Sequence, residues 1–141
     1  GSSEGGKDGM DCSLCVFDFK QMKLSVAAAH NPVWVVRNKQ LIEIKPDKMP
    51  VGKHEFQDRE FTLHEMEIQK GDLIYTLSDG FPDQFGGAKG KKFMTKNLRQ
   101  LIVNNSSLSL ADQKMVLEKS LSEWAGQMEQ VDDITIVGIK I

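Results

Sequence analysis

Short apolar runs separated by turn residues fill the first half of the chain. These runs cover residues 12–19, 24–29, 33–37, 41–44 and 61–68. Runs of this length that are bounded by Gly, Pro, Asn or Asp are typical of β-strands. We expect a hairpin connection at residues 18–23, a break at Asn31-Pro32, and a tight turn at Asn38-Lys39, because Asn tolerates a positive φ. The pattern predicts a β-meander.

The middle of the chain contains a stretch without periodicity and then a strongly apolar run. Pro46, Pro50 and Gly52 interrupt a segment that extends to about Arg59, which is expected to be a loop that crosses between sheets. Residues 72–78 are apolar at most positions, which is typical of a strand buried on both faces. This run ends abruptly at Asp79-Gly80.

Two helices and a final strand are predicted for the last third of the chain. The first helix places four apolar residues on one face, at i, i+4, i+7 and i+8: Met94, Leu98, Leu101 and Ile102. Asn104-Asn105 is its expected end. Ser109 is expected to cap a second helix near Asp112. The apolar face of this second helix is expected to comprise Leu110, Leu117, Leu121, Trp124 and Met128. Residues 134–141 read as a strand covered on both sides.

The order of these elements predicts the fold class. Several strands, then two helices, then one more strand favour an α+β layered domain over an alternating parallel-sheet fold. With 141 residues, 40% of them hydrophobic, the chain has the size of one globular domain. Residues 1–7 are expected to be a disordered lead-in, and residues 8–141 the domain.

Charge and hydropathy exclude several functions. A formal net charge of -2 provides no broad basic surface, so we expect no nucleic-acid partner and no contact with an anionic membrane. No apolar run approaches the roughly 20 residues that span a bilayer, and the first residues lack the features of a signal peptide. The expected location is therefore the cytoplasm.

The two cysteines suggest a metal or redox motif only superficially. Cys12 and Cys15 lie in a predicted strand, where residues three apart point to opposite faces. They therefore cannot share a metal ion or a disulfide, and there is no second cysteine pair to complete a zinc site. We interpret both as buried thiols of the core.

Carboxylates mark the ends of two predicted strands. Asp79 follows one strand, and Asp132-Asp133 precedes another. If these strands pair as neighbours, the carboxylates converge at one sheet edge, and hard cations such as Mg²⁺ and Mn²⁺ prefer such oxygen ligands. However, Asp-Gly is a common turn and an acidic pair before a strand is often solvated. Both interpretations stay open on spacing alone.

Four stretches resemble the SpoIIE-like (RsbU-type) branch of the metal-dependent PPM-family serine/threonine phosphatases. In chain order, they are Ala28-Ala29-His30-Asn31-Pro32, Met49-Pro50-Val51-Gly52, the strand 70–80 that ends in Ser-Asp-Gly, and Val131-Asp132-Asp133-Ile134-Thr135. The resemblance extends from about Asp8 to the last residue. It implies a PPM-like β-sandwich with flanking helices.

The resemblance also implies a site and a reaction. Asp79 would be a ligand reaching two Mn²⁺ or Mg²⁺ ions, and Asp132 a ligand of the same cluster. Asp133 would orient the metal ligands without binding the metal itself. Gly80 would let the chain turn tightly beside the metal, and His30 would be structural. The reaction would be hydrolysis of phosphoserine or phosphothreonine in a bacterial regulatory protein of the anti-sigma-factor antagonist type.

One part of the family pattern is missing. The upstream Gly-Asp and Asp-Val-Ser-Gly motifs, which supply the bridging aspartate, have no counterpart, and Asp8 and Asp11 are interpreted as turn residues. We therefore expect a partial domain without its N-terminal strands and helices, inactive alone and prone to form a homodimer through an exposed apolar face. The alternative is a non-catalytic degenerate phosphatase or protein-binding module.

Overall fold

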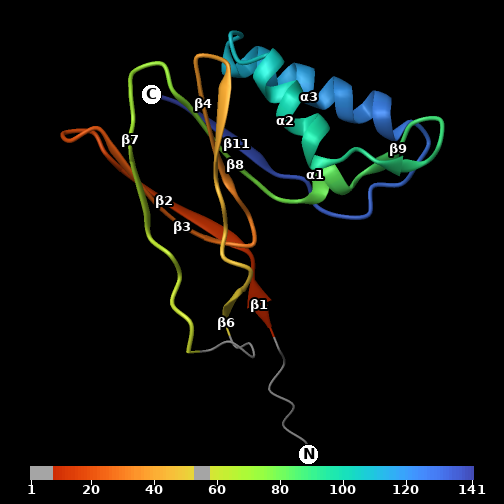
Figure 1. Ribbon diagram of the computed structural model, residues 1–141. Helices are drawn as coiled ribbons and strands as arrows, with labels where there is room; N and C mark the ends of the chain where they lie inside the picture. The colour runs from red at the N-terminus through yellow and green to blue at the C-terminus, as the bar shows by residue number, and fades with distance from the viewer. Residues whose placement is uncertain (1–7, 53–57) are drawn as a thin grey trace, which may run out of the picture.

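The described residues of the computed structural model form two main antiparallel sheets, two short two-stranded pairs and a helical layer (Figure 1). The structure describes residues 8–52 and 58–141, so the expected lead-in of residues 1–7 and part of the expected loop lie outside the described residues. The elements are β1 (Gly9–Met10), β2 (Cys12–Asp18), β3 (Lys23–Ala29), β4 (Val33–Arg37), β5 (Gln40–Ile44), β6 (Val51–Gly52), β7 (His64–Glu67), β8 (Leu73–Leu77), α1 (Gly80–Asp83), β9 (Phe85–Gly86), β10 (Lys91–Lys92), α2 (Thr95–Asn104), α3 (Leu110–Ala125) and β11 (Ile136–Lys140). The predicted α+β class is confirmed.

The sheets divide the strands between them. One sheet has the order β2-β3-β7, and the other has the order β11-β8-β4-β5. In the second sheet, Val35 of β4 pairs with Ile42 on one side and with Ile74 on the other. The predicted turn at Asn38-Lys39 joins β4 to β5, and both of its residues have positive φ values, of 50° and 60°.

The chain changes sheet between β3 and β4, so the predicted meander is wrong. His30 has a φ of 60°, and its amide donates a hydrogen bond to the Asp47 carbonyl at 3.0 Å. The Asn31 amide bonds back to the Ala29 carbonyl at 2.7 Å. This turn directs the chain out of one sheet and into the other, which produces a sandwich.

A core of apolar side chains lies between the sheets. Alternate residues of β3, including Leu24 and Val26, are fully buried and belong to the same cluster as Val33, Val35 and Ile74 of the facing sheet. This follows from the period of two along a strand. Each fully buried Leu, Val or Ile contributes roughly 1.5–3 kcal/mol, so this layer supplies much of the stability.

The helices cover the other face of the four-stranded sheet, as the sequence predicted (Figure 1). Trp34 and Tyr75 on this face share a buried cluster with Leu98 and Ile102 of α2. The Ser109 Oγ accepts the Asp112 amide at 3.1 Å, which confirms the predicted cap of α3. Among the described residues, no helix is both long and apolar enough for a bilayer span.

Three expectations about exposure and extent are wrong. The strand β11 was expected to be covered on both sides, but Val137 and Ile139 are 48% and 37% exposed because β11 is the outermost strand and pairs only with β8. Cys12 and Cys15 are free and only half-buried, since β2 is also an edge strand. Met128 lies beyond the end of α3 and is exposed.

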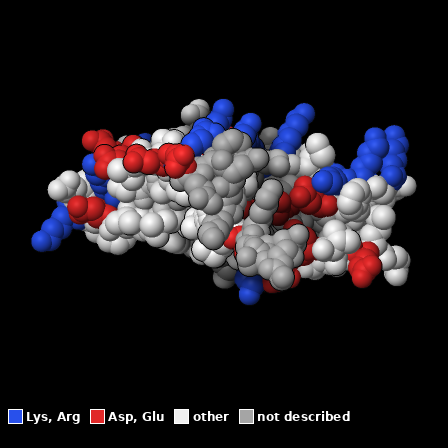
Figure 2. Space-filling view, turned by 90° about the horizontal axis from the view of Figure 1, so that it is seen from below, with Lys and Arg blue, Asp and Glu red and all other residues white. Residues whose placement is uncertain are grey.

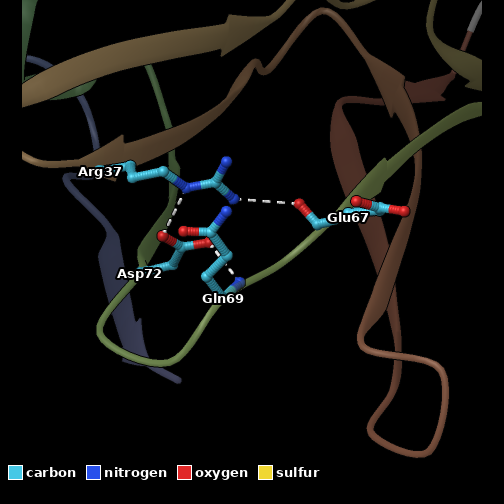
Figure 3. Close-up of polar contacts among 4 residues, drawn as sticks. All are labelled: Arg37, Glu67, Gln69 and Asp72. Atoms are coloured by element: carbon cyan, nitrogen blue, oxygen red, sulfur yellow. Dashed lines mark hydrogen bonds and ion pairs between the residues drawn. The ribbon is translucent and has the colours of Figure 1, made fainter.

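A buried ion pair ties the two sheets together (Figure 3). Arg37, at the end of β4, donates two hydrogen bonds to Asp72, from Nε to Oδ1 at 2.9 Å and from Nη2 to Oδ2 at 2.7 Å. The same Nη2 donates to the Glu67 carbonyl of the other sheet at 3.1 Å, and the Gln69 amide donates to Asp72 at 2.8 Å. Asp72 is only 1% exposed. These bonds lower the pKa of the Asp72 carboxyl, with Arg37 as the main cause.

Candidate metal centre

An acidic turn follows the end of β8. Asp79 precedes the single-turn helix α1, and the Asp83 amide donates to the Asp79 carbonyl at 3.0 Å. Residues four apart in a helical turn lie on the same side. The turn therefore brings Asp83 next to Asp79.

The start of β11 lies alongside this turn, and β8 and β11 pair as neighbours, which meets the condition under which the carboxylates converge at one sheet edge. Leu77 pairs with Ile136, and the Ser78 amide donates to the Thr135 carbonyl at 3.0 Å. The Ser78 Oγ accepts the Thr135 amide at 3.0 Å and donates to the Asp133 carbonyl at 3.3 Å. The side chain of Ser78 thus fastens the segment that carries Asp132 and Asp133 to the end of β8.

Gly80 makes the close approach of the two segments possible. A Cβ atom at this position would lie 2.1 Å from the Asp133 carbonyl oxygen and 2.9 Å from its carbonyl carbon. Because the obstacle is backbone, no side-chain rotation would relieve the clash. The glycine therefore places the acidic turn directly against the backbone of Asp133.

Like charges surround Asp79. Its pKa is raised, first by partial burial and then by the carboxylates of Asp83, Asp132 and Asp11. The Asp132 Oδ1 accepts the amide of Asp133 at 2.7 Å, which orients this carboxylate from within its own turn. The four carboxylates create a site of negative potential that favours a cation.

Two of these contributors, Asp83 and Asp11, were not expected at the site. The spacing in Asp-Gly-Phe-Pro-Asp contains the signal for Asp83, since it places two carboxylates one helical turn apart. Asp11 was interpreted as a turn residue, but its Oδ1 lies 2.7 Å from the Nδ1 of His30. This contact joins the segments that flank β2 and β3, in keeping with a structural role for His30.

The donor chemistry of the acidic turn suits a hard divalent cation, which prefers carboxylate oxygens. Within residues 8–52 and 58–141, no three or more His, Cys, Asp and Glu side chains are arranged so that they could hold a metal ion together. Asp79, Asp83 and Asp132 are therefore candidate ligands individually, and they do not form a complete three-residue set in this arrangement. A cation held here would need further ligands, from water or from protein.

A groove of about 540 Å³ lies between α3 and β11, and its lining includes Phe81 of α1. Its walls are mainly apolar and include Leu117, Leu121 and Ile136, and Tyr75 donates a hydrogen bond to Gln113 at its base. Burial raises the pKa of Tyr75 to about 12. The ionised groups that line the groove are therefore Lys114 and Glu118 of α3 rather than Tyr75.

The sandwich with its helical layer matches the fold of the PP2C-type phosphatase domains. The SiaA-PP2C domain of Pseudomonas aeruginosa superposes with a TM-score of 0.86 at 25% identity, over 93% of this chain and 51% of that one. The PP2C phosphatase domain of SpoIIE from Bacillus subtilis, with a fragment of its regulatory domain, has a TM-score of 0.70 at 18% identity, over 93% and 37%. The chain thus spans about half the length of the SiaA domain.

The sequence itself assigns the family. The model of the Stage II sporulation protein E (SpoIIE) family matches residues 3–141, and the chain belongs to this family. A search of curated proteins gave no match. A more distant fold relative is the catalytic domain of the serine/threonine phosphatase PstP in complex with two manganese ions, at 15% identity, a TM-score of 0.60, and 92% and 57% coverage.

Proposed function

We propose that this chain is the C-terminal part of a metal-dependent protein serine/threonine phosphatase domain, with Asp79 and Asp132 as metal ligands. The observation that carries the proposal is the pairing of β8 with β11, fastened by the Ser78 hydrogen bonds, which brings Asp79 and Asp132 to one sheet edge. The carboxylates of Asp83 and Asp132 add to the effect of partial burial in raising the pKa of Asp79, and carboxylates with shifted pKa values cluster at functional sites. Bound Mn²⁺ or Mg²⁺ would replace the repulsion by attraction to both carboxylates.

The remaining residues of the turn have positioning roles in this proposal. Gly80 permits the contact with the Asp133 backbone, and Asp133 orients the neighbouring Asp132 carboxylate through its amide. Asp83 adds a third carboxylate to the same site, after Asp79 and Asp132. Two bound divalent ions would lower the pKa of a water molecule and stabilise negative charge on the phosphoryl oxygens.

The proposed substrate is a phosphoserine or phosphothreonine in a regulatory protein. Support comes from the SpoIIE family match and from a structure of the RsbU and RsbW domains of a Mycobacterium tuberculosis protein. That structure has a TM-score of 0.67 at 18% identity, over 92% of this chain and 35% of its own. On the basis of the family resemblance, we propose that this substrate is of the anti-sigma-factor antagonist type and that the parent protein acts in bacterial signalling.

The 141-residue chain is proposed to need further residues for activity. It spans about half of the SiaA domain, and its described residues present no complete set of protein ligands. Metal affinity depends on the number and charge of the ligands. We therefore expect weak Mn²⁺ binding and little turnover from this chain alone.

Calorimetric titration with Mn²⁺ tests the proposal. The chain is compared with a version extended at its N-terminus into a complete domain, and each is also made as Asp79→Asn. We expect tighter binding by the extended protein, and a loss of about tenfold or more in affinity on removing the Asp79 charge. The matched control is Asp112→Asn, the same change at an exposed position in the first turn of α3.

Two results would contradict this function. Equal Mn²⁺ affinities for the extended protein and its Asp79→Asn variant would remove Asp79 from the site. Robust turnover of a phosphopeptide by the 141-residue chain would show that no further residues are needed. Metal-independent binding of a partner without turnover would instead favour a degenerate phosphatase that acts as a binding module.

A further inference from the structure

A short hairpin next to the acidic turn carries a cluster of lysines. Strands β9 and β10 pair Phe85 with Lys92 and Gly86 with Lys91. The lysine hairpin, as we call it, presents Lys89, Lys91 and Lys92, and Lys96 follows in the first turn of α2. All four residues are exposed.

The hairpin is anchored to the helical layer. The Gly87 amide donates to the Trp124 carbonyl at 2.9 Å, and the Trp124 Nε1 donates to the Gln84 carbonyl at 2.9 Å. A Cβ atom on Gly86 would lie 1.9 Å from the Trp124 carbonyl oxygen, so the backbones are in direct contact. The ring of Phe93 packs edge-on against Trp124, with centroids 5.5 Å apart. The lysines therefore project from a fixed backbone, which lowers the entropic cost of binding.

The hairpin also adjoins the proposed metal centre. Lys92 Nζ lies 3.4 Å from the Oδ1 of Asp83, the carboxylate that raises the pKa of Asp79. In Figure 2, acidic side chains gather in a recess, and basic side chains extend from there towards the side on which β9 lies in Figure 1. A ligand at the acidic turn therefore has the lysine hairpin within its immediate surroundings.

Most of this positive charge is unpaired. Lys89, Lys91 and Lys96 form no ion pair with another residue in the described part of the chain. In contrast, Lys114 and Lys119 of α3 lie 3.8 Å and 3.9 Å from the carboxylates of the glutamates four residues later. The net charge of the chain is -2, so the lysine hairpin is a local positive region on an acidic protein.

We propose that the lysine hairpin binds an acidic segment that flanks the phosphorylated residue of the protein substrate. This inference rests on the proposed function and specifies its substrate class. The phosphoryl group would enter the acidic turn with its metal ions, and Asp or Glu residues a few positions away would contact Lys89, Lys91 and Lys96. A nucleic acid fits less well, because its continuous phosphate backbone would also meet the carboxylates of the acidic turn.

Binding to two labelled peptides tests this inference without requiring turnover. Both carry a non-hydrolysable phosphonate in place of phosphoserine, and they differ only in flanking Asp and Glu residues or the corresponding Asn and Gln. Fluorescence anisotropy with the extended protein and Mn²⁺ gives each Kd. We expect the wild type to bind the acidic peptide more tightly than the neutral one. Lys89→Glu with Lys91→Glu is expected to raise the Kd for the acidic peptide about tenfold and to leave the Kd for the neutral peptide unchanged.

The matched control makes the same change in charge on α3, as Lys114→Glu with Lys119→Glu, and is expected to leave both Kd values unchanged. Equal wild-type affinities for the two peptides would overturn the inference, as would an equal loss for both peptides in the hairpin variant. Turnover of p-nitrophenyl phosphate with Mn²⁺ reports separately on the proposed function, since this small substrate has no flanking segment. Absence of this turnover in the extended protein without substitutions would contradict the phosphatase proposal. The peptide-binding result would then decide the docking site on its own.

Discussion

Two aspartates at opposite ends of β8 have opposite electrostatic surroundings. Asp72, just before the strand, is buried and receives two hydrogen bonds from Arg37, which lower its pKa. Asp79, just after the strand, lies at the surface. Its pKa is raised because its carboxylate is partly shielded from water and because other carboxylates are close to it. The same strand thus has a carboxylate paired with a cation at one end, the satisfied end, and a carboxylate surrounded by like charges at the other, the repelled end.

The difference separates residues that stabilise the fold from residues that are available for chemistry. The ion pair of Arg37 and Asp72 joins the two sheets and leaves no capacity for a ligand (Figure 3). The acidic turn destabilises the protein locally because its charges repel one another, but its exposed carboxylates can bind a cation, with Lys92 as an ion-pair partner of Asp83. Functional sites commonly break local rules of stability in this way, and the rest of the fold offsets the cost.

The largest effect is expected when the satisfied end loses its charge. Asp72→Asn leaves the Arg37 guanidinium without its carboxylate in a part-buried position, so we expect the free energy of unfolding to fall by about 3 kcal/mol. Urea denaturation at pH 7 measures this change. The control is Lys23→Gln with Glu65→Gln, which removes an exposed ion pair of 2.8 Å and is expected to cost less than about 1 kcal/mol.

The pH dependence of this loss has a defined sign. Because the folded-state pKa of Asp72 is lowered, its contribution is fully present above the unfolded carboxyl pKa of about 3.9. It is lost as the pH falls through the folded-state pKa. The wild type and Asp72→Asn are therefore expected to converge in stability below pH 4, and a difference that stays constant down to pH 2 would contradict this account.

The next effect concerns the contact that holds the acidic turn in place. In Gly80→Ala the new methyl group meets the Asp133 carbonyl, so we expect a loss of about 2 kcal/mol and weaker Mn²⁺ binding by the extended protein. The control is Gly138→Ala, where the nearest atoms are side-chain carbons of Leu110 and Tyr75 at 3.2 Å and 3.3 Å. Chemical denaturation and calorimetry check both variants. Equal losses of stability would contradict the view that the backbone contact at Gly80 makes its substitution the more costly one.

The sequence predicted local elements better than their assembly. The bounds of β4 and the cap of α3 follow from neighbouring residues, since alternation and capping are local. The change of sheet after β3 depends on the positive φ of His30 and its bond to Asp47, which no periodicity records. The exposure of β11 depends on which strands flank it in space.

The acidic site was predictable to a similar extent. Asp79 and Asp132 mark strand ends in the sequence, but the pairing of β8 with β11, which brings these ends together, was only a condition of that argument and is seen in the fold. The contribution of Asp11 is a long-range contact through the turn at His30, so its position along the chain gives no indication of it. The lysine hairpin is visible as a run of lysines, but its attachment to Trp124 is visible only in the fold.

The smallest expected effect is a gain in stability at the repelled end. Because the folded-state pKa of Asp79 is raised, its ionised form costs stability above the ordinary carboxyl pKa, and Asp79→Asn removes that cost. Solvent screens this exposed residue, so we expect a gain of only about 0.5 kcal/mol at pH 7, which disappears as the wild type becomes protonated in acid. Thermal unfolding in EDTA measures it, and Asp112→Asn again serves as the control. A loss of stability on Asp79→Asn would mean that the carboxylate makes a favourable structural contact, and the contrast between the two ends of β8 would then fail.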